Sequence, residues 1–203
     1  MRKFSLLVLA ILMIVPVSAY SAVGVGLELG GGSGTHESNY FFYESDVDTS
    51  HANISFVYDS NPYAENGNFA YRLNIGLESR ELEDEDDIIT MDSSALVFDN
   101  TFAFTLSKGD KANFWLGPQV RVGFIHGETD QEFDGDEIEA DGVMFGLGFA
   151  VGTNIKTSDN VGIGLSAGIR GVGIAGEEEW YGIEDDFEIG LGEAFVNACV
   201  LFN

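Results

Sequence analysis

The sequence of 203 residues has little cysteine, few basic residues and no long apolar run after its first residues. A single cysteine, Cys199, excludes an internal disulfide. Only 9 Lys and Arg residues stand against 34 Asp and Glu, and the formal net charge of -25 argues against DNA or RNA binding, because phosphates would be repelled. Beyond the N-terminal region no run of about 20 apolar residues occurs, which excludes a membrane-spanning helix there.

The chain is nevertheless rich in residues that pack. Hydrophobic residues make up 45% of it and aromatic residues 12%. Disordered acidic proteins lack such residues, because they cannot bury enough apolar surface to offset the conformational entropy of the chain. The composition therefore predicts one folded domain that carries a heavy negative charge.

The first residues are typical of a secretory signal peptide. Arg2 and Lys3 form a basic region, the next residues to Val17 are mostly apolar, and Val17-Ser18-Ala19 places small residues before a cleavage site. We expect residues 1–19 to be the signal peptide and residues 20–203 to be the mature domain, with cleavage after Ser21 as the alternative. No cysteine follows the apolar stretch, so a lipoprotein is not expected.

The mature sequence alternates with a period of two, which predicts β-strands. One face of each strand is large and apolar, and the other is small or polar. We count eight strands, at 23–29, 52–58, 69–77, 96–106, 114–124, 143–151, 161–170 and 194–202.

Two positions depart from this alternation. Asn100 lies on the apolar face of its strand, for which we expect a β-bulge. Phe187, Ile189 and Leu191 have the opposite parity to the apolar residues of the last strand, which leaves the register there open.

The connections alternate between short turns and long acidic segments. This predicts an all-β fold, an antiparallel up-and-down transmembrane β-barrel with short periplasmic turns and long acidic extracellular loops. The short turns are 59–68, 107–112 and 157–160, and the long segments are 31–50, 81–92, 128–141 and 177–186.

The charged residues indicate which face of the strands points toward lipid. An Arg on the lipid side costs about 2–4 kcal/mol at the bilayer midplane. Every Arg of the strands, and several Glu, have the parity of the glycine-rich face, so we expect the apolar face toward lipid and a structural network of ion pairs in the lumen. The predicted network consists of Glu28, Arg72, Glu78, Arg80, Arg121, Arg170 and Glu193.

In these features the chain resembles the small outer-membrane barrels of the OmpA, OmpX and OmpW type, from Val23 to Phe202. The resemblance implies location in the bacterial outer membrane, with outer-membrane lipid, lipopolysaccharide and the barrel-assembly machinery as partners. It also implies an assembly signal at the last aromatic residue, Phe202, although Asn203 follows it.

Motifs for catalysis or metal binding are weak. The string from Gly164 to Gly168 matches G-x-S-x-G around Ser166, but it lies inside an alternating strand rather than at a strand-to-helix turn. The histidines lack metal-ligand spacing, and His126 is interpreted as a polar residue at the rim. We therefore predict no catalytic, cofactor-binding or metal residues.

Clusters of acidic residues at 81–87, 134–139 and 177–179 are interpreted as solvated surface, with binding of Ca²⁺ or Mg²⁺ as the alternative. The leading hypothesis is a non-enzymatic outer-membrane protein with an envelope-structural or surface-interaction role. The alternatives are a narrow pore for ions or small solutes, and a lipid-modifying or proteolytic barrel enzyme.

Overall fold

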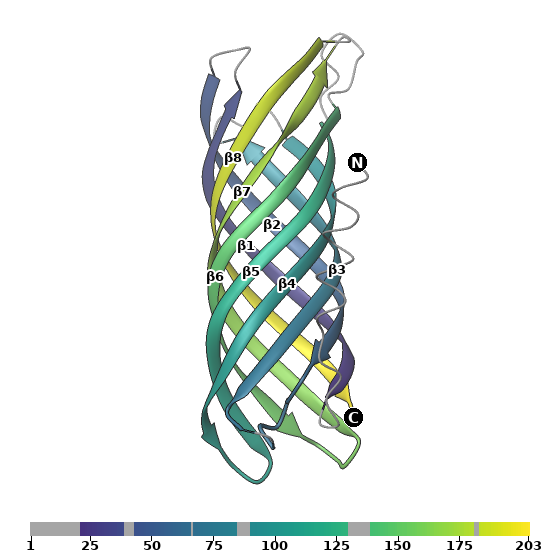
Figure 1. Cartoon of the computed structure of the whole chain (residues 1–203). Coiled ribbons are helices and arrows are strands. Elements are labelled where there is room, and N and C mark those ends of the chain that lie inside the picture. The colour runs from purple at the N-terminus through teal and green to yellow at the C-terminus, as the bar shows by residue number, and fades with distance from the viewer. Residues whose placement is uncertain (1–20, 39–42, 66, 85–89, 130–138, 181–182) are drawn as a thin grey trace, which may run out of the picture.

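The computed structural model describes residues 21–38, 43–65, 67–84, 90–129, 139–180 and 183–203. Eight antiparallel strands form a closed barrel in which each strand pairs with its neighbours in sequence and β1 pairs with β8 (Figure 1). The strands are β1 (Ala22–Ser38), β2 (Tyr43–Asp59), β3 (Phe69–Asp84), β4 (Thr90–Lys108), β5 (Ala112–Thr129), β6 (Glu139–Lys156), β7 (Val161–Trp180) and β8 (Ile183–Phe202). The prediction of an all-β, antiparallel up-and-down β-barrel of eight strands is confirmed. The predicted signal peptide lies outside the described residues.

Among the residues that the structure describes, no helix has the length and apolar character needed to cross a membrane.

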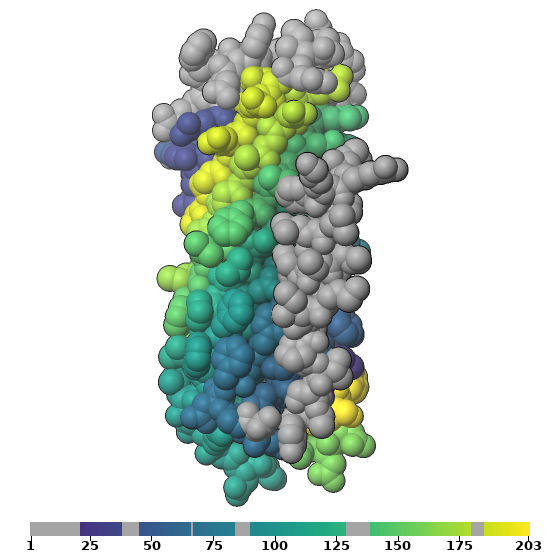
Figure 2. Space-filling model, in the orientation of Figure 1, coloured from purple at the N-terminus to yellow at the C-terminus, as the bar shows by residue number. Residues whose placement is uncertain are grey.

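An apolar belt surrounds the outside of the barrel. Its large side chains keep between 38% and 71% of their surface exposed, and they come from every strand. They include Leu27, Ile54, Leu77, Phe104, Phe114, Phe145, Ile169 and Val196. In Figure 2, side chains of β5, β6, β7 and β8 form a continuous outer wall where they are in view. So much exposed apolar surface fits lipid rather than water.

The three short turns lie at the same end of the barrel as the C-terminus (Figure 1). The turn between β2 and β3 folds into the mouth of the barrel, where the Pro62 carbonyl oxygen accepts hydrogen bonds from Asn113 (2.9 Å) and Asn154 (2.6 Å). Lys108 donates to the carbonyl oxygens of Ala64 (2.7 Å) and Gly67 (3.0 Å) in the same turn. The turn therefore covers this mouth of the lumen.

At the opposite end the strands run further than the alternation predicted. β1 reaches Ser38 and β2 begins at Tyr43, so most of the predicted loop 31–50 is strand. The interval between β7 and β8 is likewise reduced to residues 181 and 182. Many acidic residues of the predicted loops therefore lie on strands.

At the outer ends of the strands, the arrangement of the belt is reversed: apolar side chains face inward and polar side chains face outward. Their inward side chains form an apolar cluster that includes Val97, Met144, Val172 and Ile174. Phe187, Ile189 and Leu191 belong to this cluster and point inward together with Glu193, so β8 keeps one register throughout. Its change in sequence pattern marks the point where the inside of the barrel becomes apolar.

Asn100 does not lie at a bulge, so the expectation for this position is wrong. It faces outward, and its Oδ1 accepts a hydrogen bond of 2.6 Å from the Tyr71 hydroxyl. The irregularity of β4 lies further along, between Thr105 and Ser107. A polar side chain on the outer wall is therefore stabilised by a polar partner on the next strand.

We predict that Tyr71→Phe lowers the free energy of unfolding by about 1–3 kcal/mol, because Asn100 Oδ1 loses its hydrogen-bond donor in an apolar setting. Urea unfolding in detergent micelles measures this. The double variant Tyr71→Phe/Asn100→Leu should regain most of the loss, since no polar group is left without a partner. A single variant as stable as the native chain would contradict the pairing.

Candidate functional site

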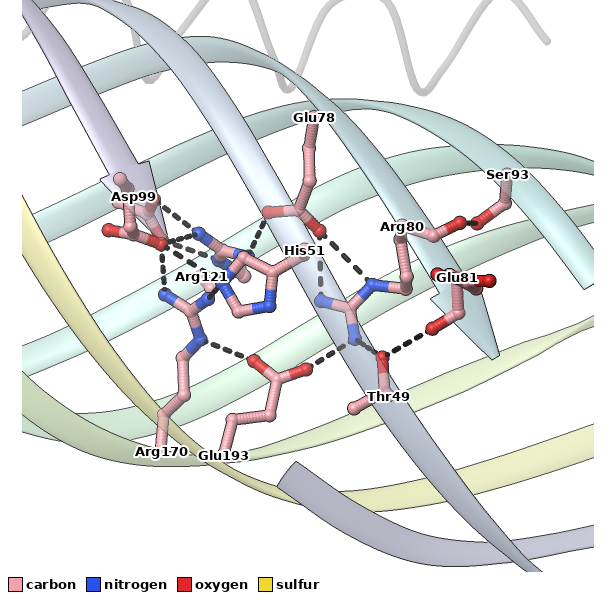
Figure 3. A network of polar contacts seen from close by, with 11 residues as sticks. Thr49, His51, Glu78, Arg80, Glu81, Ser93, Asp99, Arg121, Arg170 and Glu193 are labelled. Atoms are coloured by element: carbon pink, nitrogen blue, oxygen red, sulfur yellow. Dashed lines mark hydrogen bonds and ion pairs between the residues drawn. The ribbon is translucent and has the colours of Figure 1, made fainter. Parts of the chain in front are cut away.

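A network of buried charges crosses the lumen (Figure 3). Seven of the eight strands contribute to it, and its charged side chains expose no more than 1% of their surface. Its members are Glu28, Thr49, His51, Glu78, Arg80, Asp99, Arg121, Arg170 and Glu193. We refer to this group as the luminal network.

Arg121 occupies the centre of the luminal network. Its guanidinium donates to both carboxylate oxygens of Asp99 (2.7 and 2.8 Å) on the neighbouring β4. It also donates to Glu78 on β3 (2.6 Å) and to Glu28 on β1 (2.9 Å). One side chain therefore connects β5 to three other strands, two of them across the lumen.

Arg170 and Arg80 extend the network to the remaining strands. Arg170 donates to Glu28 (2.9 Å) and Glu193 (2.8 Å). Arg80 binds Glu78 (2.8 Å) and Glu193, so Glu193 joins the two arginines. Because each carboxylate accepts from at least one guanidinium, the cost of removing these charges from water is offset by charge-assisted hydrogen bonds.

β6 contributes space rather than charge. Gly146 and Gly148 lie opposite Arg121 and Arg170 in the β5–β6 and β6–β7 pairings. A Cβ at Gly148 would lie 2.6 Å from the Cβ of Arg170, and one at Gly146 would lie 3.2 Å from the Cβ of Arg121. The guanidinium groups reach the lumen because these two positions carry no side chain.

Arg72 lies in a second, separate polar cluster nearer the short turns. It donates to Asp59 (2.9 Å) and to Asn154 (2.6 Å). An apolar layer lies between the two clusters, in which Trp115 packs against the Arg72 guanidinium at 4.9 Å and Phe195 packs against that of Arg170 at 4.7 Å. The lumen is therefore filled by alternating ionic and apolar layers.

The structure places all seven predicted residues inside the barrel, and all except Arg72 in the luminal network. The predicted network did not include Asp59, His51 and Asp99, which lie on the same inward face. Their parity was a sufficient signal: His51 and Asp59 alternate with Ala52 and Tyr58, and Asp99 follows the outward Phe98. Asp59 falls in the predicted turn 59–68, and the predicted network contains Arg and Glu residues alone.

His51 lies within the luminal network. Its Nε2 lies 2.8 Å from Arg170 and 3.5 Å from Glu28 Oε1. Possible ligand atoms of Glu28, His51 and Glu78 lie within 4.8 Å of one another, which is a spacing for a metal ion. Both carboxylates already bind guanidinium groups, however, so the positive charge at this point comes from arginine.

Above the apolar belt, exposed carboxylates surround the outer wall. We name them the carboxylate collar: Glu37, Asp46, Asp48, Glu81, Glu83, Asp92, Glu128, Glu139, Asp141, Glu177, Glu179, Asp186 and Glu188. A single cross-strand row joins five of them, in the order Glu81, Asp92, Glu128, Glu139 and Glu179. Like charges directly opposite one another destabilise a sheet, so this row carries unfavourable electrostatic repulsion.

His126 lies in this collar, outside the apolar belt. Its Nδ1 lies 2.9 Å from Asp141 and its Nε2 lies 3.5 Å from Glu128. The hydrogen bond to Asp141 raises the pKa of His126 above its ordinary value. Ser166 of the G-x-S-x-G string has the inward parity of β7, so His126 and Ser166 lie on opposite faces of the wall and do not form a catalytic pair.

We predict that Arg121→Glu lowers the free energy of unfolding by more than about 3 kcal/mol, because it removes a guanidinium shared by three buried carboxylates and adds a fourth carboxylate. Lys111→Glu, in the exposed turn between β4 and β5, should change it by no more than about 0.5 kcal/mol. Lys108 is the poorer control, since it binds the β2–β3 turn.

Urea unfolding and refolding in detergent micelles compares the two variants. Arg121→Lys, which keeps the charge but loses the paired hydrogen bonds, should lie between them. Equal losses for Arg121→Glu and Lys111→Glu would show that the luminal network does not stabilise the barrel.

No protein-family model matches the sequence, and no curated protein matches it. Among solved structures, the outer membrane protein OprG from Pseudomonas aeruginosa matches with a TM-score of 0.54 at 9% identity, over 88% of this chain and 95% of that chain. Neisserial surface protein A matches with a TM-score of 0.40 at 13% identity, over 88% and 96%. The outer membrane protease OmpT from Escherichia coli matches with a TM-score of 0.42 at 8% identity, over 90% and 96%. The likeness to OprG shows the fold, which together with the closed ring of eight antiparallel strands is that of a small outer-membrane β-barrel.

Proposed function

We propose that this chain is a non-enzymatic, non-conducting protein of the bacterial outer membrane with an envelope-structural role. The observation that carries the proposal is the filled lumen. A solute entering from the short-turn end meets the β2–β3 turn, then the Arg72 cluster, the layer of Trp115 and Phe195, the luminal network and the apolar cluster of the outer ends. Displacing any of these layers would break packed or charge-paired contacts.

The filled lumen weakens the alternative of a narrow pore for ions or small solutes. An ion crossing the luminal network would have to replace a guanidinium or a carboxylate that is already paired. An apolar solute would meet these same charges, at a high desolvation cost. The barrel wall is therefore the part of the molecule best suited to interaction.

The placement of charge on that wall supports a partner in the lipid layer. The carboxylate collar lies directly above the apolar belt, whereas Lys108, Lys111 and Lys156 lie at or beside the short turns of the other end. Among the described residues, no Lys or Arg lies on the outer face of the strand segments that carry the collar. Ca²⁺ and Mg²⁺ prefer carboxylate and phosphate oxygens. The collar would therefore bind divalent cations that it shares with the phosphates of lipopolysaccharide.

The same reasoning supports the remaining parts of the proposal. A lipid-modifying or proteolytic activity would need its reacting groups together, and His126 and Ser166 lie on opposite faces of the wall.

The last strand ends with Phe202 exposed on the outer wall, paired with Val23 and Val161, where the barrel closes. This position fits recognition by the barrel-assembly machinery before the ring is closed.

We predict that the purified protein gives no discrete conductance steps in planar lipid bilayers, because each luminal layer is occupied by protein. A porin of known conductance in the same membranes serves as the positive control. Reproducible steps of one size from the native chain would contradict a closed lumen and favour the pore.

We predict that the barrel in nanodiscs containing lipid A retains Ca²⁺ in equilibrium dialysis severalfold above discs without protein. Asp92→Asn/Glu128→Gln/Glu139→Gln should remove most of this excess, because it neutralises the middle of the carboxylate row. The matched control neutralises three exposed acids at the opposite end: Glu65→Gln, Asp110→Asn and Asp159→Asn. An equal loss of Ca²⁺ in both variants would contradict a specific role of the collar.

A further inference from the structure

The outer wall has a groove where β6, β7, β8 and β1 lie side by side. It has a volume of about 440 Å³ and crosses two rows of paired residues. One row runs from Phe145 through Gly173 and Gly190 to Thr35. The other runs in parallel from Val143 to the directly opposed pair Glu188 and Glu37. The groove is therefore apolar at its β6 side and acidic where β8 meets β1.

The floor of the groove is open because its residues are small. A Cβ at Gly173 would lie 4.0 Å from the carbonyl oxygen of Phe145, and one at Gly190 would lie 3.9 Å from the hydroxyl oxygen of Thr35. By contrast, Gly32 and Gly34 of β1 face the lumen side, where a Cβ would meet the carbonyl oxygens of β8. The outward glycines are thus not required by close packing of the chain, and they leave room for another molecule.

The polarity of the groove indicates what kind of molecule fits. Phe145 and Val143 expose 54% and 48% of their surfaces and continue the apolar belt. Glu37 and Glu188 belong to the carboxylate collar, and their direct opposition disfavours them without a cation between them. An occupant must therefore be apolar at one end and associated with positive charge at the other, and it must lie where the belt meets the collar.

We propose that this groove binds one lipopolysaccharide molecule of the outer leaflet. An acyl chain lies against Phe145 and the glycine floor, and a lipid phosphate binds Glu37 and Glu188 through a shared divalent cation. This inference rests on the proposed role of the collar, and it adds a defined slot for a single lipid on one side of the barrel. The remaining collar would contact the surrounding lipid without such a slot.

The test replaces the small residues at the floor of the groove with large apolar ones. Gly173→Leu/Gly190→Leu places two apolar side chains in the open space, and Ala167→Leu adds one on the same outer face of β7 away from the groove. Native mass spectrometry of the detergent-solubilised barrel with lipid A and Mg²⁺ measures the lipid retained. We expect one lipid A on the native chain and on Ala167→Leu, and at least a tenfold loss of the bound form on the filled variant. Heat-modifiable gel migration verifies that each variant is folded.

A second pair of variants tests the ionic end without altering the floor. Glu37→Gln/Glu188→Gln should abolish Mg²⁺-dependent retention, whereas Asp48→Asn/Glu83→Gln, an opposed pair between β2 and β3, should preserve it. Retention on the filled variant equal to that on the native chain would overturn the slot and leave the collar proposal intact. Absence of Mg²⁺-dependent lipid A on the native chain would overturn both. A second copy of the chain displaced by the leucines would identify a protein interface instead.

Discussion

The guanidinium of Arg121 lies at the centre of the barrel, where water does not reach it, and binds carboxylates from three other strands. A charge in such a place is tolerated only when its partners are held in good geometry, and those partners come from β1, β3 and β4. Arg80 and Arg170 then share Glu193 on the other side. Closure of the ring and neutralisation of the network therefore depend on each other: an incomplete ring would leave a carboxylate or a guanidinium unpaired.

The barrel meets two different surroundings along its axis, lipid at the belt and water at the outer ends of the strands. Within the belt the apolar side chains face outward and the charges face inward, as a lipid environment requires. At the outer ends the apolar cluster around Met144 and Ile174 is inside and the carboxylates are outside, as in a barrel surrounded by water. The strands can continue past the belt because this reversal satisfies both surroundings. It also explains why so much acidic sequence forms strand.

Alternation in the sequence was enough to predict the barrel, its eight strands and the side of the wall on which each Arg lies. It was not enough at the outer ends, because the rule that apolar residues face outward no longer holds there, and Phe187 to Leu191 therefore looked out of register. The prediction from alternation also left out His51 and Asp99, although both have the parity of the inward face. The hydrogen bond from Tyr71 to Asn100 joins two strands and leaves no trace in the pattern of either one.

The absence of charged side chains on β6 in the luminal network has a consequence for how this sequence can diverge. At the other positions of the luminal network a substitution is limited by charge, since each Arg, Glu and Asp there binds a side chain of opposite sign. At Gly146 and Gly148 it is limited by volume, because even a methyl group would meet the stem of an arginine on an adjacent strand. Homologous chains that keep the arginines should therefore keep the inner face of β6 small, while its outer face below the groove can exchange one apolar side chain for another.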